Sequence, residues 1–236
     1  QNPDVFRFWY GLAMADAAIQ ALRAGVSGVI AWDLDDAMYF LGDGEECMNS
    51  LDEKLPADAY ERRKIWGMWN ILGAEHGHPE EEQLRPWFFA WAALARTFPA
   101  GCRPVEVDAT GIPGLRVAAA QLASVGGYSI AIVNHDQWPR RLRIEAPAAT
   151  EAVTLVEWKY IDADNDNRVD CWPQTVDAAG RDIFPGPVGA KHDVRLAEGL
   201  TLEVPAGALV ILTTGTESVP AARSEEHTSE LQSPNT

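Results

Sequence analysis

The chain has 236 residues, a length that fits one large domain or two small ones. With 47% hydrophobic and 23% charged residues, its composition is that of a folded globular protein and not of a disordered one. The formal net charge of −16 argues against nucleic acid as a partner, because phosphates are bound by Lys and Arg. No run of about 18 uncharged apolar residues occurs, so the sequence predicts no membrane span.

The first predicted element is a helix over residues 4–24. Asn2 can cap it, Pro3 suits the first helical position, and Gly25 provides a stop. Apolar side chains cover most of its circumference, and the polar stripe is narrow. That stripe consists of Asp16, Gln20 and Arg23. A helix this apolar is expected to be covered on more than one side.

A short apolar strand is predicted over residues 28–32, Gly-Val-Ile-Ala-Trp. Such a run is typical of a strand buried on both faces of a parallel sheet. Ligands of α/β proteins bind at the carboxyl ends of these strands, where Trp32 is followed by Asp33, Asp35 and Asp36. An indole can stack on a sugar ring, and carboxylates can accept hydrogen bonds from its hydroxyls. These four residues are therefore the main candidates for sugar binding.

Each candidate also has a structural interpretation. The Trp32 indole could simply fill the end of a barrel, and Asp is frequent in turns and helix caps. A catalytic pair made from the three Asp residues alone is not expected, because they are too close in sequence to face each other across a substrate.

An irregular stretch over residues 40–82 follows and contains an apolar segment at residues 64–70. Trp66 and Asn70 are predicted to line the outer part of a cleft, although packing is favoured for Trp66 and Trp69. A second helix is predicted over residues 83–98 from apolar residues at helical spacing.

From residue 102 onward the pattern alternates with period two, which predicts an antiparallel β-sandwich. The expected strands are residues 103–107, 115–123, 128–134, 140–146, 155–160, 200–204 and 208–213. The change in pattern along the chain therefore predicts an α/β segment over residues 1–100, a β-sandwich over residues 101–215 and a disordered tail over residues 216–236.

Metal sites and cofactors are not indicated. The three cysteines fit no zinc pattern. Residues 162–170 place carboxylates at positions 1, 3, 5 and 9 of a calcium loop, but Asn167 replaces the required Gly and Pro173 the bidentate Glu. A solvated hairpin tip is favoured there over a calcium site.

Six motifs in this order resemble the C-terminal part of bacterial clan A glycoside hydrolases, close to cellulase-like members of family 5. They are Trp9-Tyr10-Gly11, Ala15-Asp16, residues 31–36 (Ala-Trp-Asp-Leu-Asp-Asp), residues 64–70 (Lys-Ile-Trp-Gly-Met-Trp-Asn), residues 85–91 (Arg-Pro-Trp-Phe-Phe-Ala-Trp) and residues 204–213 (Val-Pro-Ala-Gly-Ala-Leu-Val-Ile-Leu-Thr). The resemblance spans residues 1–214 and implies the terminal segment of an (α/β)8 TIM barrel followed by the sandwich.

The resemblance also implies a function. Such enzymes cleave β-linked glycans by double displacement with two Glu residues, which would lie on barrel strands preceding residue 1. No catalytic residue is therefore expected in this chain, and the fragment alone is expected to be inactive. Trp32 matches the aromatic floor of the sugar subsite. An oligo- or polysaccharide substrate, no cofactor, and a secreted or periplasmic location are implied for the intact protein.

The last residues, from Arg223 to Ser233, match a translated sequencing adapter. Residues 223–236 are therefore excluded from the fold prediction, and the chain is interpreted as an assembled fragment. The alternative interpretation is a non-catalytic carbohydrate-binding or structural β-sandwich module with a helical preface.

Overall fold

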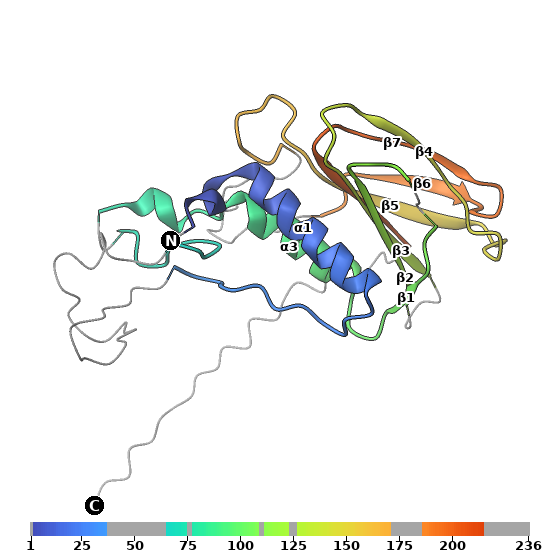
Figure 1. Ribbon diagram of the computed structural model, residues 1–236, viewed down its shortest axis with the longest axis horizontal. Coiled ribbons are helices and arrows are strands. Elements are labelled where there is room, and N and C mark those ends of the chain that lie inside the picture. The colour runs from blue at the N-terminus through green and yellow to red at the C-terminus, as the bar shows by residue number, and fades with distance from the viewer. Residues whose placement is uncertain are drawn as a thin grey trace, which may run out of the picture.

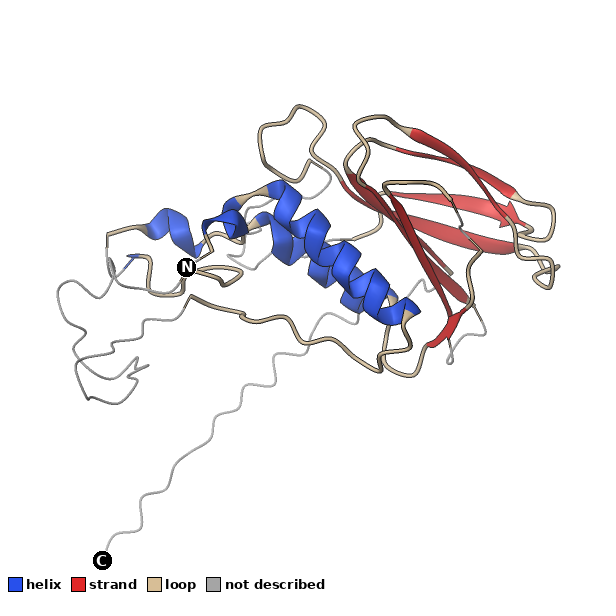
Figure 2. Ribbon diagram, viewed as in Figure 1, coloured by secondary structure: helices blue, strands red, loops and turns tan. Residues whose placement is uncertain are grey.

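Three layers make up the part of the chain that the computed structural model describes, which is residues 2–36, 65–74, 77–108, 111–122, 127–170 and 186–214. Two helices cover one face of a six-stranded antiparallel sheet, and a two-stranded sheet lies against the other face (Figures 1 and 2). Within these ranges, no helix has both the length and the hydropathy needed to cross a bilayer.

The two helices form close to the predicted positions. A short 3₁₀ helix, Pro3–Phe6, leads into α1, Phe8–Arg23, and the Asn2 side chain accepts a hydrogen bond from the Asp4 N–H at 3.2 Å. Gly25 ends the helix with a φ of 78°, a left-handed conformation that favours glycine. The second helix, α3, spans Pro86–Thr97 and follows a 3₁₀ helix at Pro79–Glu82.

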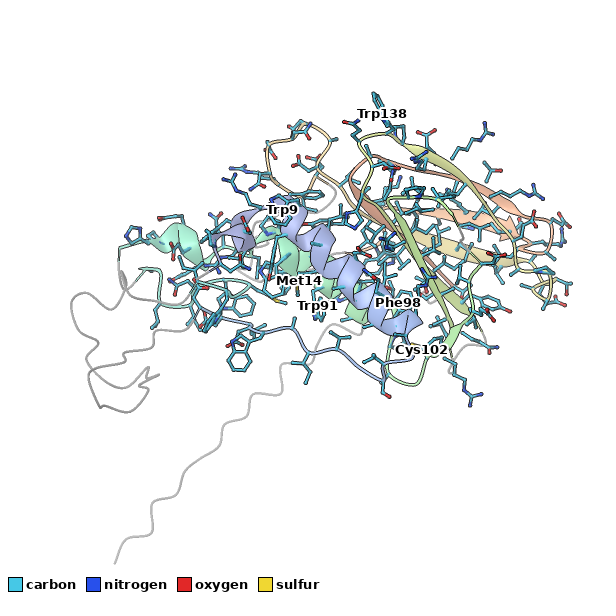
Figure 3. All side chains as sticks on the ribbon, in the orientation of Figure 1. Trp9, Met14, Trp91, Phe98, Cys102 and Trp138 are labelled. Atoms are coloured by element: carbon cyan, nitrogen blue, oxygen red, sulfur yellow. The ribbon has the colours of Figure 1, made fainter. Side chains whose placement is uncertain are left out.

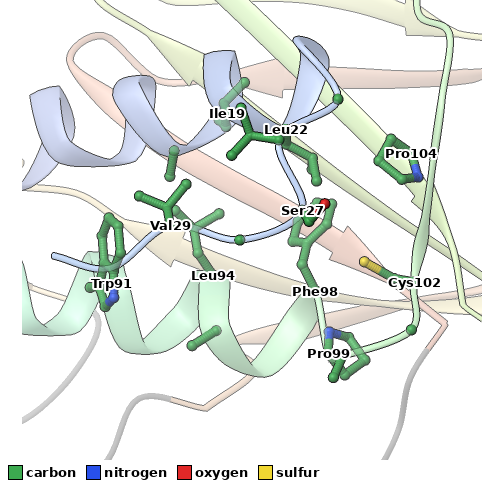
Figure 4. Close-up of a pocket in the computed structure, with 17 residues that line it drawn as sticks. Ile19, Leu22, Ser27, Val29, Trp91, Leu94, Phe98, Pro99, Cys102 and Pro104 are labelled. Carbon is green, nitrogen blue, oxygen red and sulfur yellow. The ribbon is translucent and has the colours of Figure 1, made fainter.

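Helices α1 and α3 lie side by side and run in the same direction (Figures 1 and 4). Because neighbouring helices in one direction cannot be joined by a short turn, the chain must return between them. Residues 25–36 make the first part of this return as an extended segment alongside the helices (Figure 1). Helix, extended return and parallel helix is the connectivity of an α/β unit.

The predicted buried strand at residues 28–32 is wrong. These residues form no strand, and Ile30 and Val29 are 95% and 44% exposed. A parallel strand is buried only when other strands pair with both edges and helices cover both faces. In the described ranges this segment pairs only further on, through an isolated parallel bridge between Asp35 and Trp69. No barrel is seen among the described residues.

The β-region confirms the predicted antiparallel strands. Its strands are β1 (Arg103–Val105), β2 (Leu115–Gln121), β3 (Tyr128–Asn134), β4 (Arg140–Ile144), β5 (Val153–Tyr160), β6 (Gly189–Val194), β7 (Leu200–Val204) and β8 (Ala208–Thr213). Their order is β1-β2-β3-β8-β5-β6 in the large sheet and β4-β7 in the small one. Strand β6 was not predicted, because its sequence, Gly-Ala-Lys-His-Asp-Val, shows no alternation of apolar residues.

Two hydrophobic cores lie on opposite faces of the large sheet. The first joins the helices to the sheet and includes Ile19, Trp87 and Ile211. The second lies between the two sheets and includes Ile132, Leu155 and Val204. Because alternate residues of a strand point to opposite faces, β3 and β8 contribute to both cores.

Specific contacts fix the helices on the sheet. Tyr160 of β5 stacks on Phe8 with ring centroids 4.3 Å apart, and its hydroxyl donates to the Phe8 carbonyl at 2.8 Å. Asp16 of α1 lies 3.0 Å from His135 Nε2 and 3.6 Å from Arg116 Nε, both on the sheet side.

Candidate functional site

The segment that carries the predicted sugar-binding residues begins with Trp32. Its indole is 64% exposed, and the Trp32–Asp33 peptide bond is cis. Asp33 is half-buried, and its Oδ1 accepts a hydrogen bond from the Leu34 N–H at 2.6 Å. An aromatic face therefore lies open to solvent beside a carboxylate.

Asp36 is the buried end of this segment. It is 4% exposed, and its two carboxylate oxygens accept hydrogen bonds from the Arg85 guanidinium at 2.7 and 2.5 Å. Oδ1 also accepts from the backbone N–H groups of Trp66 and Gly67 at 3.0 and 2.9 Å. Because the carboxylate is buried and accepts four hydrogen bonds from protein donors, Asp36 serves here to position the segment.

Arg85 connects three parts of the chain. Besides its pair with Asp36, it donates to the Gly67 carbonyl at 2.7 Å, and its guanidinium lies 4.3 Å from the centre of the Phe6 ring. The Trp87 indole N–H donates to the same carbonyl at 3.0 Å. The ion pair therefore ties residues 34–36 to the start of α3 and to the N-terminal 3₁₀ helix.

Gly67 allows the closest approach in this network. A Cβ at this position would lie 2.3 Å from the Asp35 carbonyl carbon and 2.5 Å from the Asp36 nitrogen. Two backbone hydrogen bonds, Asp36 N–H to the Trp69 carbonyl and Met68 N–H to the Leu34 carbonyl, join the two segments. Residues 34–36 are thus paired with residues 67–69 while Trp32 extends beyond the pairing.

Asp35 is half-buried, and its Oδ1 accepts from the Ile71 N–H at 2.9 Å. Burial raises the pKa of this carboxyl group above its ordinary value, although the hydrogen bonds from the backbone oppose the shift. Because this pKa is higher in the folded chain, the carboxyl group binds its proton more tightly in the folded state than in the unfolded state.

This shift predicts a pH dependence of stability. The stabilisation is fully present below the unfolded pKa and is lost as pH rises from about 3.8 through the raised folded value. Asp35→Asn keeps an oxygen acceptor for Ile71 and removes the titration, so its free energy of unfolding should fall less steeply across this range. Urea denaturation at several pH values measures the slope of the free energy of unfolding against pH.

A second carboxyl group contributes to the same slope, because burial also raises the pKa of Asp162. Only the double variant Asp35→Asn with Asp162→Asn should remove both contributions. Identical slopes for the wild type and Asp35→Asn would contradict the prediction.

The residues predicted to line the outer cleft lie beneath this segment. Asn70 is fully buried, and its amide donates to Glu81 Oε2 at 2.9 Å. Trp69 packs edge-on against Phe88, with ring centroids 6.3 Å apart, and Trp66 is half-buried. The contact with Phe88 agrees with the packing alternative for Trp69, and the packing of Trp66 stays a prediction.

A cavity of about 660 Å³ lies between α1, α3 and the extended segment (Figure 4). Its walls are apolar and include Leu22, Val29, Trp91 and Phe98. Cys102 is the one described lining residue that can ionise, and burial raises the pKa of its thiol. Among the described residues that line it, the cavity thus brings together no acid and base.

Residues 162–170 form a loop that contacts the start of α1, so they are more than a solvated tip. Asn167 Oδ1 accepts from the Phe8 N–H at 2.7 Å, and its amide donates to the Phe6 carbonyl at 2.6 Å. Asn167 has a φ of 73° at the position where a calcium loop has Gly. Carboxylate oxygens of Asp162, Asp164 and Asp166 lie within 4.8 Å of one another.

Arg85 and Glu81 complete the site but were not among the predicted residues. The sequence held one signal for Arg85, a single charge beside Pro86 at the start of a strongly apolar run. Nothing in the sequence pairs it with Asp36, which lies 49 positions away. Pro173 and the tail at residues 223–236 lie outside the described residues.

No protein-family model matches this chain, and no curated protein matches it. Comparison with solved structures finds distant, partial similarity to clan A glycoside hydrolases of families 30 and 51 and to related enzymes.

Three of these structures illustrate the level of similarity. A family 30 endoxylanase from Clostridium papyrosolvens has 12% identity and a TM-score of 0.39, over 63% of this chain and 31% of its own. A bifunctional glucanase-xylanase from a metagenome library has 16% identity and a TM-score of 0.34, over 54% of this chain and 22% of its own. A family 51 α-L-arabinofuranosidase from Bifidobacterium longum has 15% identity and a TM-score of 0.35, over 54% of this chain and 25% of its own. This chain therefore spans about a third or less of each.

Proposed function

We propose that this chain supplies part of the substrate-binding wall of a retaining glycoside hydrolase that acts on β-linked glycans. The observation that supports this proposal most strongly is the exposed Trp32 indole beside Asp33, on a segment fixed by the buried Asp36–Arg85 pair. An aromatic face with an adjacent hydrogen-bond acceptor fits a sugar ring and its hydroxyls, as binding sites combine apolar surface with a few polar groups.

The connectivity of the helical layer supports the same proposal. The extended residues 25–36 return beside two helices of one direction, which is the place of a strand in an α/β unit (Figure 1). Although residues 28–32 form no strand here, Trp32 lies toward the carboxyl end of this extended return, and α/β folds bind ligands at the carboxyl ends of their strands. The division into a barrel segment ending near residue 100 and a sandwich after it remains part of this proposal.

Catalysis in this proposal requires groups from outside the chain. Double displacement needs two carboxyl groups about 5 Å apart, one as nucleophile and one as acid and base. Asp36 is neutralised by Arg85. Asp33 and Asp35 lie two positions apart on one segment, so they cannot face each other across a substrate. We therefore assign Asp33 and Asp35 to substrate contact and positioning. The intact enzyme would be secreted or periplasmic and would need no cofactor.

A second candidate function is carbohydrate binding by the sandwich without catalysis. It rests on Trp138, which is 65% exposed and points away from the outer edge of the sandwich (Figure 3). Trp32 and Trp138 are almost equally exposed and lie on different layers, so they form a matched pair for an experiment.

We expect soluble xylo- and cello-oligosaccharides to bind weakly to the chain, with a dissociation constant near 1 mM, and Trp32→Ala to weaken binding about tenfold. Covering the open part of an indole contributes about 1.5 kcal/mol or more, and 1.4 kcal/mol is a factor of ten. Titration calorimetry measures the effect. Trp32→Phe keeps an aromatic face and should retain most of the affinity.

Trp138→Ala is the matched control and should bind as the wild type does. If Trp138→Ala abolishes binding and Trp32→Ala does not, the chain is a sandwich-type binding module. Release of reducing ends from the same oligosaccharides is expected to be undetectable, and turnover by the purified chain would contradict the assignment of catalysis to groups elsewhere.

A further inference from the structure

The polar stripe of α1, which consists of Asp16, Gln20 and Arg23, lies beside β2 and the turn that leads into it. Asp16 contacts the sheet through an ion pair with Arg116. Further along the helix, Gln20 and Arg23 line a cavity of about 720 Å³. The facing wall comes from the start of β2 and the turn before it, and includes Ile112, Pro113 and Arg116. We call this cavity the α1–β2 groove.

The charge of the groove is positive. Its described lining contains two charged groups, the guanidinium groups of Arg23 and Arg116, and no carboxylate. This contrasts with the whole chain, in which 35 acidic residues outnumber 19 basic ones. Asp16 is the one described carboxylate that pairs with either arginine, and its Oδ1 lies 3.6 Å from Arg116 Nε. Its Oδ2 lies 3.0 Å from His135 Nε2, so the single negative charge of Asp16 leaves the two arginines incompletely neutralised.

Both guanidinium groups keep hydrogen-bond donors for a ligand. Arg116 Nη1 donates to the Leu115 carbonyl at 3.1 Å, and its Nη2 has no partner among the described residues. The side chain of Arg23 is exposed and makes no hydrogen bond or ion pair with the described part of the chain. A guanidinium presents its donors as a planar fork that matches a carboxylate or a phosphate group. Two such forks that line one groove therefore favour an anionic ligand.

The size and the remaining lining of the groove favour a ligand larger than an inorganic ion. Small-molecule sites commonly have volumes of about 300–1,000 Å³ and combine apolar surface with a few polar groups. Ile112, which is 37% exposed, and Pro113 supply apolar surface beside the arginines. Gln20 adds an exposed amide, which can both donate and accept hydrogen bonds. A sugar ring that carries an anionic group has an apolar face, hydroxyl groups and a charge to match these three features.

We propose that the α1–β2 groove binds an acidic sugar, whose carboxylate or phosphate group is held between Arg23 and Arg116. The sugar ring packs on Ile112 and Pro113, and Gln20 forms hydrogen bonds with its hydroxyl groups. A sugar acid and a sugar phosphate share this chemistry, and the experiment below distinguishes them. The inference does not depend on the proposed glycosidase function, because it uses none of the residues assigned to substrate contact there.

Titration calorimetry on the full chain tests the proposal with trigalacturonate and glucose 6-phosphate, and with maltotriose and glucose as their neutral counterparts. At least one of the two anions should bind about tenfold or more tighter than its neutral counterpart and than inorganic phosphate, and which anion does so identifies the group. Arg23→Gln should weaken this binding about tenfold, and Arg23→Lys should weaken it less, because the charge remains and the fork is lost. Arg103→Gln removes an exposed arginine of β1 that does not line the groove, so this matched control should bind as the wild type does. Trp32→Ala should also bind the anion as the wild type does.

No saturable binding of either anion, or equal binding of the anions and their neutral counterparts, would overturn the proposal. Inorganic phosphate that binds as tightly as both sugar anions would overturn the assignment of a sugar ring to the groove. Arg23 is exposed, so Arg23→Gln should melt as the wild type does, and unchanged anion affinity in that folded variant would also overturn the proposal. Loss of anion binding in Trp32→Ala but not in Arg23→Gln would place the ligand beside Trp32 instead.

Discussion

Asp36→Asn is expected to lower the free energy of unfolding by about 3–5 kcal/mol. The substitution leaves the Arg85 guanidinium buried at 3% exposure without its counter-charge, and an uncompensated buried charge costs about this much. The Gly67 carbonyl and the Phe6 ring remain as partners of Arg85, but neither carries a charge. Urea denaturation followed by tryptophan fluorescence measures the change.

The double variant Asp36→Asn with Arg85→Met separates the charge effect from local packing. The Asn oxygen still accepts from the Trp66 and Gly67 N–H groups, and Met fills the space without a charge. More than half of the lost stability should return. A cost below about 1 kcal/mol for Asp36→Asn alone would show that the pair does not hold residues 34–36 in place.

Gly11→Ala is expected to cost about 3 kcal/mol, the upper part of the usual range for overpacking. A Cβ on Gly11 would lie 2.2 Å from the Tyr160 hydroxyl oxygen, 2.7 Å from its Cζ and 2.9 Å from the Trp87 Cα. The last contact is with backbone, so α1 and α3 would have to separate. Thermal and urea denaturation measure the loss.

Two controls make the Gly11 prediction specific. Gly28→Ala meets no atom within 4 Å and should leave stability unchanged or slightly raised. Tyr160→Phe alone should cost about 1 kcal/mol through the lost hydrogen bond to the Phe8 carbonyl. The double variant Gly11→Ala with Tyr160→Phe should lose less stability than the two single variants added together, because removing the Tyr160 hydroxyl removes the shortest clash. Strict additivity would mean that the two residues do not meet.

Much of the fold follows from local patterns in the sequence. The alternation that predicts strands at residues 128–134, 200–204 and 208–213 matches β3, β7 and β8 residue for residue. Strand β7 alternates because one of its faces lies against a core, whereas β3 and β8 are buried on both faces and read as short apolar runs between turn residues. Helix α1 ends at the predicted stop, Gly25, whereas the predicted cap, Asn2, caps the 3₁₀ helix Pro3–Phe6 that precedes it.

The remaining features depend on partners distant in sequence. Residues 28–32 have the composition of a buried strand, but burial requires neighbouring strands that the composition of one segment does not supply. The role of Asp36 depends on Arg85, and no local rule connects the two. Among the described strands only β5 pairs with β6, and the exposed residues of β6 carry no alternation.

The most direct test of the account follows the indole N–H signals of the tryptophans by NMR while a β-linked xylo-oligosaccharide is added, with Trp32→Ala and Trp138→Ala used for assignment. The account predicts that the Trp32 signal shifts progressively and saturates, whereas the Trp138 signal stays unchanged. A saturating shift of Trp138 with Trp32 unmoved would contradict it and would assign glycan contact to the sandwich.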